Sequence, residues 1–179
     1  QPKPVQTAYT ISFNSAAEMA KDAKLNQHRP LLKLKLASAD DFDRVLAVRK
    51  AAPNSTLIVD ANEGWTISIL ENLAPKLADL GVALIEQPLR AGEDKVLDGR
   101  AFAVPLCADE SCRLIEDLPN LAQKYSYINI KLDKTGGLTH ALEFVKKAQD
   151  LNLKLMIGCM VSTSLSMAPA SLLAPFAEF

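Results

Sequence analysis

Short apolar runs alternate along this chain with longer stretches in which apolar residues recur at helical spacing. This alternation is typical of repeated strand and helix units that build a parallel sheet. The pattern predicts seven strands, over residues 9–13, 31–36, 56–60, 83–86, 106–109, 127–131 and 154–158. It predicts helices between them, over residues 15–25, 40–51, 66–80, 115–124, 138–151 and 164–173. We therefore expect an α/β fold of the TIM barrel kind, forming a single partial barrel domain over residues 1–179.

The unit that follows Glu86 has the weakest helical pattern. Its segment RAGEDKVLDGR contains few apolar residues and no helical period. We expect only a short turn of helix there before the next strand.

Five of the apolar runs end on a charged residue: Lys35, Asp60, Glu86, Asp109 and Lys131. In a barrel of strand and helix units, the carboxyl ends of the strands and the loops after them carry the chemistry. A charged group beside a buried strand is costly unless it meets a partner, a metal or a substrate. The five residues together predict one site at the carboxyl end of the barrel.

Side chains alternate between the two faces of the strand LLKLKL because its period is two residues. Leu32, Leu34 and Leu36 share one face, and Lys33 and Lys35 share the other. An isolated strand of this kind could simply present two solvated lysines. The acidic residues at the ends of the later strands favour the interpretation in which both lysines point into the barrel.

The carboxylates of Asp60, Glu86 and Asp109 follow three consecutive strands, so they lie on one arc of the predicted barrel. Three carboxylates with water and substrate oxygens suit Mg²⁺, which prefers octahedral oxygen coordination, although any single one could be a helix cap or a loop acid. In an eight-strand barrel the second and sixth strands stand opposite each other. Lys35 and Lys131 are then placed to remove a proton from one face of a carbon acid and return one to the other.

The composition limits the class of protein. With 49% hydrophobic residues, 20 basic against 21 acidic residues and a net charge of −1, the chain has no basic stripe, and we expect no nucleic-acid partner. Three cysteines are an odd number for a disulfide framework, so we expect reduced thiols in a cytoplasmic protein. No apolar run has the length of a membrane span, so we expect no membrane partner. The opening QPKPV lacks an initiator methionine, so we expect the chain to start inside a longer protein or after a cleavage.

The motifs KLK, VDAN, IEQP, ADES and NIKLDKTGG occur in this order at barrel spacing. Together they resemble the enolase superfamily, in its muconate-lactonising branch, and most of all its dipeptide epimerases of the L-Ala-D/L-Glu type. The resemblance covers nearly the whole chain. It implies a (β/α)7β barrel and an isomerase that epimerises dipeptides by two-base 1,1-proton transfer through an enediolate.

The resemblance also implies a role for each matching residue. Asp60, Glu86 and Asp109 would bind Mg²⁺, with Mn²⁺ as an alternative, and the metal would hold the substrate carboxylate. Lys35 and Lys131 would be the base and acid on the two faces of the substrate. Lys33 would stabilise the substrate carboxylate and lower the pKa of its neighbour, because a lysine with a reference pKa of ~10.4 accepts a proton near neutral pH only when that pKa falls. The resemblance implies that the partner would be a small carboxylate substrate, a dipeptide, and a homo-oligomer is compatible with the sequence.

Several neighbouring residues have two interpretations. Asn62 and Glu110 could orient metal ligands or could be solvated loop residues. Trp65 could border the mouth of the site, but packing at a helix start is the commoner role of such an aromatic residue. Cys107 is expected in the core.

The chain also departs from the family. Nothing in it corresponds to the amino-terminal capping domain, and the sequence stops at Phe179, where the last strand should begin. We therefore expect a partial barrel that lacks the capping domain and most of the last strand. Three interpretations remain open: a dipeptide epimerase, a muconate cycloisomerase or o-succinylbenzoate synthase with the same lysines and acids, and a non-catalytic remnant that binds only metal or ligand.

Overall fold

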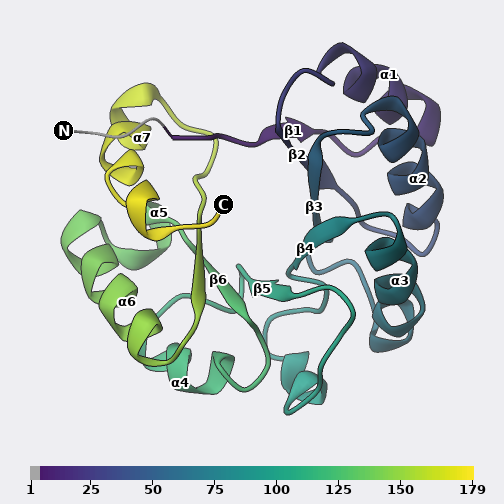
Figure 1. Cartoon of the computed structure of the whole chain (residues 1–179). Coiled ribbons are helices and arrows are strands. Elements are labelled where there is room, and N and C mark those ends of the chain that lie inside the picture. The colour runs from purple at the N-terminus through teal and green to yellow at the C-terminus, as the bar shows by residue number, and fades with distance from the viewer. Residues whose placement is uncertain (1–4) are drawn as a thin grey trace.

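Seven parallel strands form one curled sheet in the order of the sequence, as the computed structural model of residues 5–179 shows (Figure 1). The strands are β1 (Tyr9–Ile11), β2 (Leu31–Lys35), β3 (Thr56–Asp60), β4 (Val82–Glu86), β5 (Leu106–Ala108), β6 (Tyr127–Ile130) and β7 (Lys154–Ile157). All seven predicted strands are confirmed, with small differences at their ends. Because consecutive strands are neighbours, their carboxyl ends lie side by side along one rim of the sheet.

Helices cover the outer face of the sheet. The longer ones are α1 (Ala16–Leu25), α2 (Asp41–Ala51), α3 (Ile67–Asp79), α6 (Leu138–Asp150) and α7 (Ser164–Ser171). The main apolar core lies between them and the sheet, and Leu32, Leu34 and Leu36 of the second strand region are buried in it. The leucine face of the KLK segment therefore packs under the helices, as the alternation predicts.

The prediction of one continuous helix over residues 115–124 is wrong. It forms a 3₁₀ turn, η2 (Ile115–Asp117), followed by a short α-helix, α4 (Leu118–Leu121). Pro119 lies in the first turn of α4 and has no N–H to donate back to an earlier carbonyl, so a regular helix cannot run through from residue 115. The weak unit after Glu86 is confirmed as the short 3₁₀ helix η1 (Asp94–Leu97), and another, η3 (Ala174–Phe176), follows α7.

A one-turn helix that the pattern did not predict, α5 (Leu132–Thr135), follows β6 directly. It ends at Gly136, whose φ of 79° is in the left-handed region that glycine adopts without strain. This turn places Lys134 one helical turn after Lys131.

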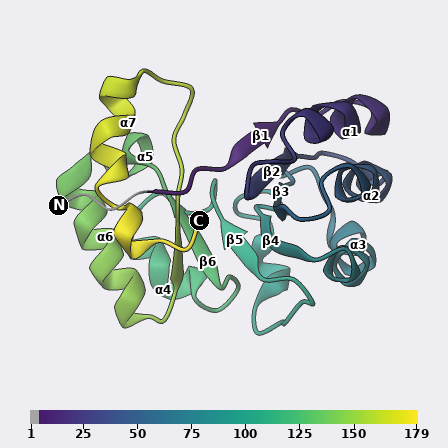
Figure 2. The same ribbon diagram turned by 45° about the horizontal axis from the view of Figure 1, so that its top comes forward.

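The sheet curls into a partial barrel whose first and last strands are not paired with each other in the described part of the chain (Figure 2). The last residues begin to add alongside β7, because Glu178 N donates to Leu155 O and Ile157 N donates to Phe179 O, each at 2.9 Å. Inside the curl, a smaller apolar cluster fills the level below the charged residues: Leu31, Ile58, Leu84, Cys107, Tyr127 and Met156. Among residues 5–179, no helix is both long and apolar enough to cross a membrane.

Candidate active site

Lys33 and Lys35 lie on the inner face of β2, as the alternation predicts. Lys33 Nζ is 2.9 Å from Asp60 Oδ2 and 2.5 Å from Glu86 Oε2, so one ammonium bridges the ends of β3 and β4. Lys35 Nζ is 2.7 Å from the same Asp60 oxygen. The side chain of Lys35 is 36% exposed against 13% for Lys33, so Lys35 is the more accessible of the two to a substrate.

Three carboxylates lie at the ends of adjacent strands. Asp60 is the last residue of β3, Glu86 is the last residue of β4, and Asp109 directly follows β5. Each of them is buried, with 1–2% of its surface exposed. Asp60 and Glu86 are register partners across β3 and β4, which places their side chains on the same face of the sheet.

The charges of the site shift several pKa values. Burial raises the pKa of Glu86, Lys33 lowers it, and the charges of Asp60 and Asp109 raise it further, so the net shift is upwards. Burial alone would lower the pKa of Lys33, but the charges of Glu86 and Asp60 outweigh burial and raise it. These shifts show that the three acids act on one another and hold the nearest lysine in its protonated form.

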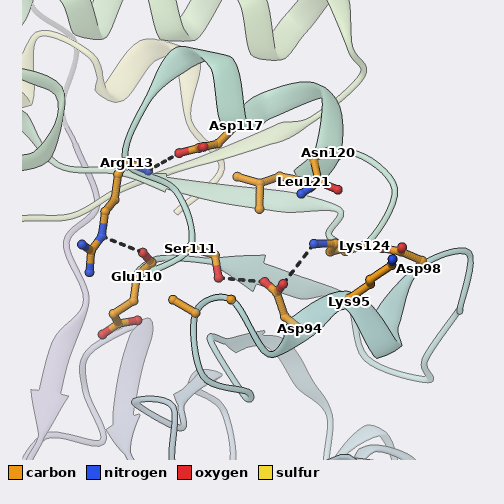
Figure 3. Close-up of a pocket in the computed structure, with 12 residues that line it drawn as sticks. Asp94, Lys95, Asp98, Glu110, Ser111, Arg113, Asp117, Asn120, Leu121 and Lys124 are labelled. Atoms are coloured by element: carbon orange, nitrogen blue, oxygen red, sulfur yellow. Dashed lines mark hydrogen bonds and ion pairs between the residues drawn. The ribbon is translucent and has the colours of Figure 1, made fainter.

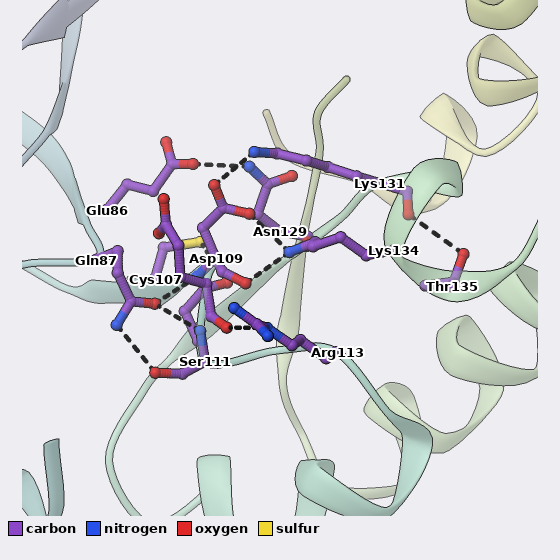
Figure 4. A network of polar contacts seen from close by, with 12 residues as sticks. Glu86, Gln87, Cys107, Asp109, Ser111, Arg113, Asn129, Lys131, Lys134 and Thr135 are labelled. Carbon is purple, nitrogen blue, oxygen red and sulfur yellow. Dashed lines mark hydrogen bonds and ion pairs between the residues drawn. The ribbon is translucent and has the colours of Figure 1, made fainter. Parts of the chain in front are cut away.

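Two lysines share the carboxylate of Asp109 (Figure 4). Lys131 Nζ donates to Asp109 Oδ2 at 2.5 Å, and Lys134 Nζ donates to Asp109 Oδ1 at 2.6 Å. Burial raises the pKa of Asp109, but these two lysines outweigh burial and lower it. Burial lowers the pKa of Lys131, while its hydrogen bond and ion pair with Asp109 raise it to a larger extent.

Lys134 is a functional candidate that the strand pattern missed. Its ammonium also donates to the backbone carbonyls of Asp109, at 2.6 Å, and Asn129, at 3.0 Å. The three bonds tie the ends of β5 and β6 together. Its spacing of three residues from Lys131, one helical turn in the segment KLDK, is the sequence signal that could have found it.

Asn129 lies two residues before Lys131 on the same face of β6 and was also missed. Its Nδ2 donates to Glu86 Oε1 at 2.7 Å, so Lys33 and Asn129 hold the two oxygens of Glu86 from opposite strands. The side chain is fully buried, and its Oδ1 has no hydrogen-bond partner among the described residues. The neighbouring strand leaves room for it at Gly158, where a Cβ would meet Asn129 Oδ1 at 2.5 Å.

The other residues near the site divide between the two interpretations. Asn62 is exposed, and its backbone N–H donates to Asp60 Oδ1 at 3.0 Å, so its main chain orients this carboxylate. Glu110 has a buried Oε2 without a hydrogen-bond partner in the described structure, and burial, with the charge of Asp109, raises its pKa. Trp65 is a packing residue whose Nε1 donates to the buried Asp41 at 2.8 Å. Cys107 lies in the core, as expected.

The donor chemistry fits Mg²⁺. As the side chains stand, no three acidic, histidine or cysteine groups in residues 5–179 converge closely enough to hold an ion, and each of the three carboxylates is turned towards a lysine. Asp60, Glu86 and Asp109 nevertheless offer only hard oxygen donors, buried on adjacent strand ends and coupled through their charges. A divalent cation would relieve the repulsion among them. The assignment of these three residues as metal ligands remains a prediction.

Two cavities open at this end of the sheet. The larger, of about 1190 Å³, is lined by Lys33, Lys35, Asp109, Lys131 and Lys134, together with apolar residues of β7 and α7. A second, polar cavity of about 710 Å³ lies between the loops that follow β4 and β5 (Figure 3). Its wall contains a buried ion pair of Lys124 with Asp94 at 3.0 Å. Glu110 lines both cavities, so the second adjoins the first.

This fold and this rim define a parallel α/β barrel domain with lysines and carboxylates gathered at the carboxyl ends of its strands. A family model described as "Enolase C-terminal domain-like" matches residues 15–177, and the chain belongs to this family, the carboxyl-terminal domain of the enolase superfamily.

Two curated proteins illustrate the similarity. An N-acetyl-D-glutamate racemase of Pseudoalteromonas sp. is 48% identical over 172 residues, covering 96% of this chain and 55% of that protein. The L-Ala-D/L-Glu epimerase of Escherichia coli strain K12 is 43% identical over 180 residues, covering 99% of this chain and 56% of that protein. The chain therefore spans about half the length of the curated relatives it matches.

Two solved structures show the same similarity. An enolase family member from Agrobacterium tumefaciens, described as homologous to dipeptide epimerases and bound to sodium and L-Ala-L-Glu, superposes with a TM-score of 0.94 at 49% identity, covering 99% of this chain and 55% of that one. A dipeptide epimerase from Enterococcus faecalis, complexed with Mg and L-Leu-L-Tyr, gives a TM-score of 0.90 at 30% identity over 97% of this chain and 52% of that one. The half-barrel thus matches the barrel domain of this superfamily without its capping domain.

Proposed function

We propose that this protein is an Mg²⁺-dependent epimerase that moves the α-proton of an N-acylated amino acid, with a dipeptide such as L-Ala-D/L-Glu as its substrate. The observation that carries the proposal is the arrangement of Lys35 and Lys131. They come from β2 and β6, line the same cavity, and enclose between them the three strands that end in carboxylates.

Each lysine serves one face of the substrate in this proposal. One lysine takes the α-proton as a base, and the other, protonated, returns a proton to the opposite face, which inverts the carbon. Bound Mg²⁺ would supply positive charge to the substrate carboxylate as the proton leaves.

Lys33 and Lys134 have supporting roles. Lys33, deeper than Lys35 and paired with both Asp60 and Glu86, stays protonated and adds positive charge beside the substrate carboxylate. Lys134 keeps its three bonds to the ends of β5 and β6. Lys131 has one acceptor, Asp109, and is free to turn towards a substrate once that ion pair opens.

The relatives support the class of substrate. The named substrates of the two curated proteins, N-acetyl-glutamate and L-Ala-D/L-Glu, are both glutamates acylated on nitrogen and carry a free α-carboxylate. These relatives favour epimerisation over cycloisomerisation or o-succinylbenzoate synthesis. The similarity to the racemase makes N-acetyl-glutamate the second candidate substrate.

The test is exchange of the α-proton in D₂O, followed by NMR, with L-Ala-L-Glu, other dipeptides and N-acetyl-L-glutamate. We expect exchange with Mg²⁺ and none with a chelator. Exchange of N-acetyl-glutamate alone would move the proposal to the second candidate. A folded protein that binds Mg²⁺ but exchanges none of these protons would contradict the proposal and favour a binding protein or the cycloisomerase and synthase substrates.

A further inference from the structure

Gln87 is buried completely between two of the proposed metal ligands. It follows Glu86 directly, precedes Pro88, and has no exposed surface. Its φ of +33° is a conformation that residues with a side chain rarely adopt. Such strain persists only where the surroundings hold the residue in several ways at once.

The Gln87 side chain uses both ends of its amide (Figure 4). Its Oε1 accepts from the backbone N–H of Asp109 at 2.8 Å and from that of Ser111 at 3.1 Å. Its Nε2 donates to Leu89 O at 2.8 Å, Ser111 Oγ at 2.9 Å and Tyr125 Oη at 3.2 Å.

The main chain of Gln87 is held as firmly as the side chain. Its N–H donates to Cys107 O at 2.8 Å, and its carbonyl accepts from Glu63 N at 2.9 Å. Gln87 therefore links the end of β4 to the loops after β3 and β5, which are the three segments that carry the carboxylates.

We propose that Gln87 is a positioning residue that fixes the main chain of Asp109 relative to Glu86 and so sets the spacing of the second and third metal carboxylates. This inference rests on the proposed metal site. The Asp109 N–H has Gln87 as its acceptor, and a buried amide that loses its acceptor is costly, so the turn at Asp109 must move when this bond is removed. Groups that orient metal ligands in this way typically contribute roughly 10- to 100-fold to metal affinity.

The side chain of Gln87 is neutral, so a variant can separate the effect of position from the effect of charge. Replacing it with methionine of similar length removes hydrogen bonds without changing the charge near the carboxylates. Any loss of metal affinity then reports a change in position rather than a change in electrostatic attraction.

The experiment measures Mn²⁺ affinity by electron paramagnetic resonance in wild type, Gln87→Met and Gln87→Asn. Mn²⁺ is the probe, and unfolding in urea is recorded on the same samples without metal. We expect Gln87→Met to bind Mn²⁺ roughly 10- to 100-fold more weakly than wild type. Gln87→Asn keeps a polar amide but is one methylene too short to span Asp109 and Tyr125, so we expect a smaller loss of Mn²⁺ affinity in the same direction. This variant provides the test if Gln87→Met does not fold.

Tyr125→Phe is the matched control. It removes a hydroxyl that accepts from Gln87 and donates to Asp94, so it also costs stability, but it leaves the bonds from Asp109 and Ser111 to Gln87 intact. We expect its Mn²⁺ affinity to stay close to that of wild type.

The outcomes separate the two proposals. Wild-type affinity in both Gln87 variants, or equal losses in Gln87→Met and Tyr125→Phe, would overturn the positioning role of Gln87. A wild-type protein that binds no Mn²⁺ would instead overturn the metal site on which the inference depends.

Discussion

Gly158 of the β7 end leaves the space that the Asn129 side chain occupies: a Cβ at residue 158 would lie 2.5 Å from Asn129 Oδ1 and 2.8 Å from its Nδ2. Because Asn129 is the residue that donates to Glu86 Oε1, the absence of a side chain at the end of β7 controls the position of a carboxylate three strands away, on β4.

The first prediction follows from this contact. Gly158→Ala should lower the free energy of unfolding by about 1–3 kcal/mol, since extra volume in a packed interior forces its neighbours to shift. Urea unfolding followed by circular dichroism measures the change.

Asn129→Ala provides the control, because it removes the side chain that the new methyl group would meet and completes a double-mutant cycle with Gly158→Ala. In the double variant the added methyl group meets an alanine, so the cost of Gly158→Ala should fall well below its cost in wild type. Equal costs in the two backgrounds would mean that the clash lies elsewhere.

The second prediction concerns Lys35 and Lys131, the two lysines that we propose face the substrate. Lys35→Ala and Lys131→Ala should each lower the rate of epimerisation by roughly 10²–10⁴-fold, because each removes one of the two proton carriers. Each variant should still exchange the α-proton of one epimer, the one that faces the remaining lysine. NMR in D₂O with the separate L and D epimers makes the measurement.

A loss of exchange from both epimers in both variants, with Mn²⁺ binding unchanged, would argue against a separate role for each face. Lys76→Ala is the matched control, because this exposed lysine on α3 donates to Asn72, lies over the ring of Phe42 and does not line the cavity that contains Lys35 and Lys131.

The sequence predicted the strands, the rim and its five charged ends because strand period and helical period are local properties of the chain. Asp60, Glu86 and Asp109 could be grouped because strands in sequence order bring their carboxyl ends together. The same reasoning could not predict three further contacts. Those of Lys134 depend on the unpredicted turn α5, those of Asn129 on a neighbouring glycine, and those of Gln87 on a strained main chain. The position of Asp41 also depends on a distant contact: it is fully buried at the start of α2 and accepts hydrogen bonds from the loop after β2 and from Trp65.

The third prediction tests that loop. Asp41 accepts from Ala37 N at 3.0 Å, Ser38 N at 2.8 Å and Trp65 Nε1 at 2.8 Å, so it links the loop after β2 to the loop after β3. Trp65→Phe should cost about 1–3 kcal/mol of unfolding free energy, because the buried carboxylate loses one donor. Thermal or urea unfolding reports it.

Phenylalanine also fills less space than tryptophan, so part of that cost is packing. Trp65→Phe in an Asp41→Asn background separates the two terms. A cost that is the same in both backgrounds would show that the hydrogen bond contributes nothing measurable.

The fourth prediction concerns pH. Burial raises the pKa of Asp94, but hydrogen bonds from Ser111, Lys124 and Tyr125 outweigh burial and lower it. A carboxyl whose pKa is lower in the folded state contributes stability above its unfolded pKa of ~3.9 and loses it as the pH falls through the folded value.

Urea unfolding of wild type and Asp94→Asn between pH 7 and pH 3 tests this sign. Breaking the buried pair with Lys124 should cost about 3–5 kcal/mol at pH 7, and the difference between the proteins should shrink below about pH 4. A difference that grows towards acid pH would show that Asp94 is held in its neutral form.

The rim carries more positive than negative side chains among those in direct contact. Lys33, Lys35, Lys131 and Lys134 meet the carboxylates of Asp60, Glu86 and Asp109, so ammonium groups exceed carboxylates before any metal ion is added. Although the chain as a whole is almost neutral, the four ammonium groups that meet at the strand ends leave one positive charge unmatched by the three carboxylates they contact. For the proposed epimerase, we therefore expect this unmatched ammonium to favour a substrate that carries a second carboxylate, and we expect the binding of such a substrate to weaken as salt is added.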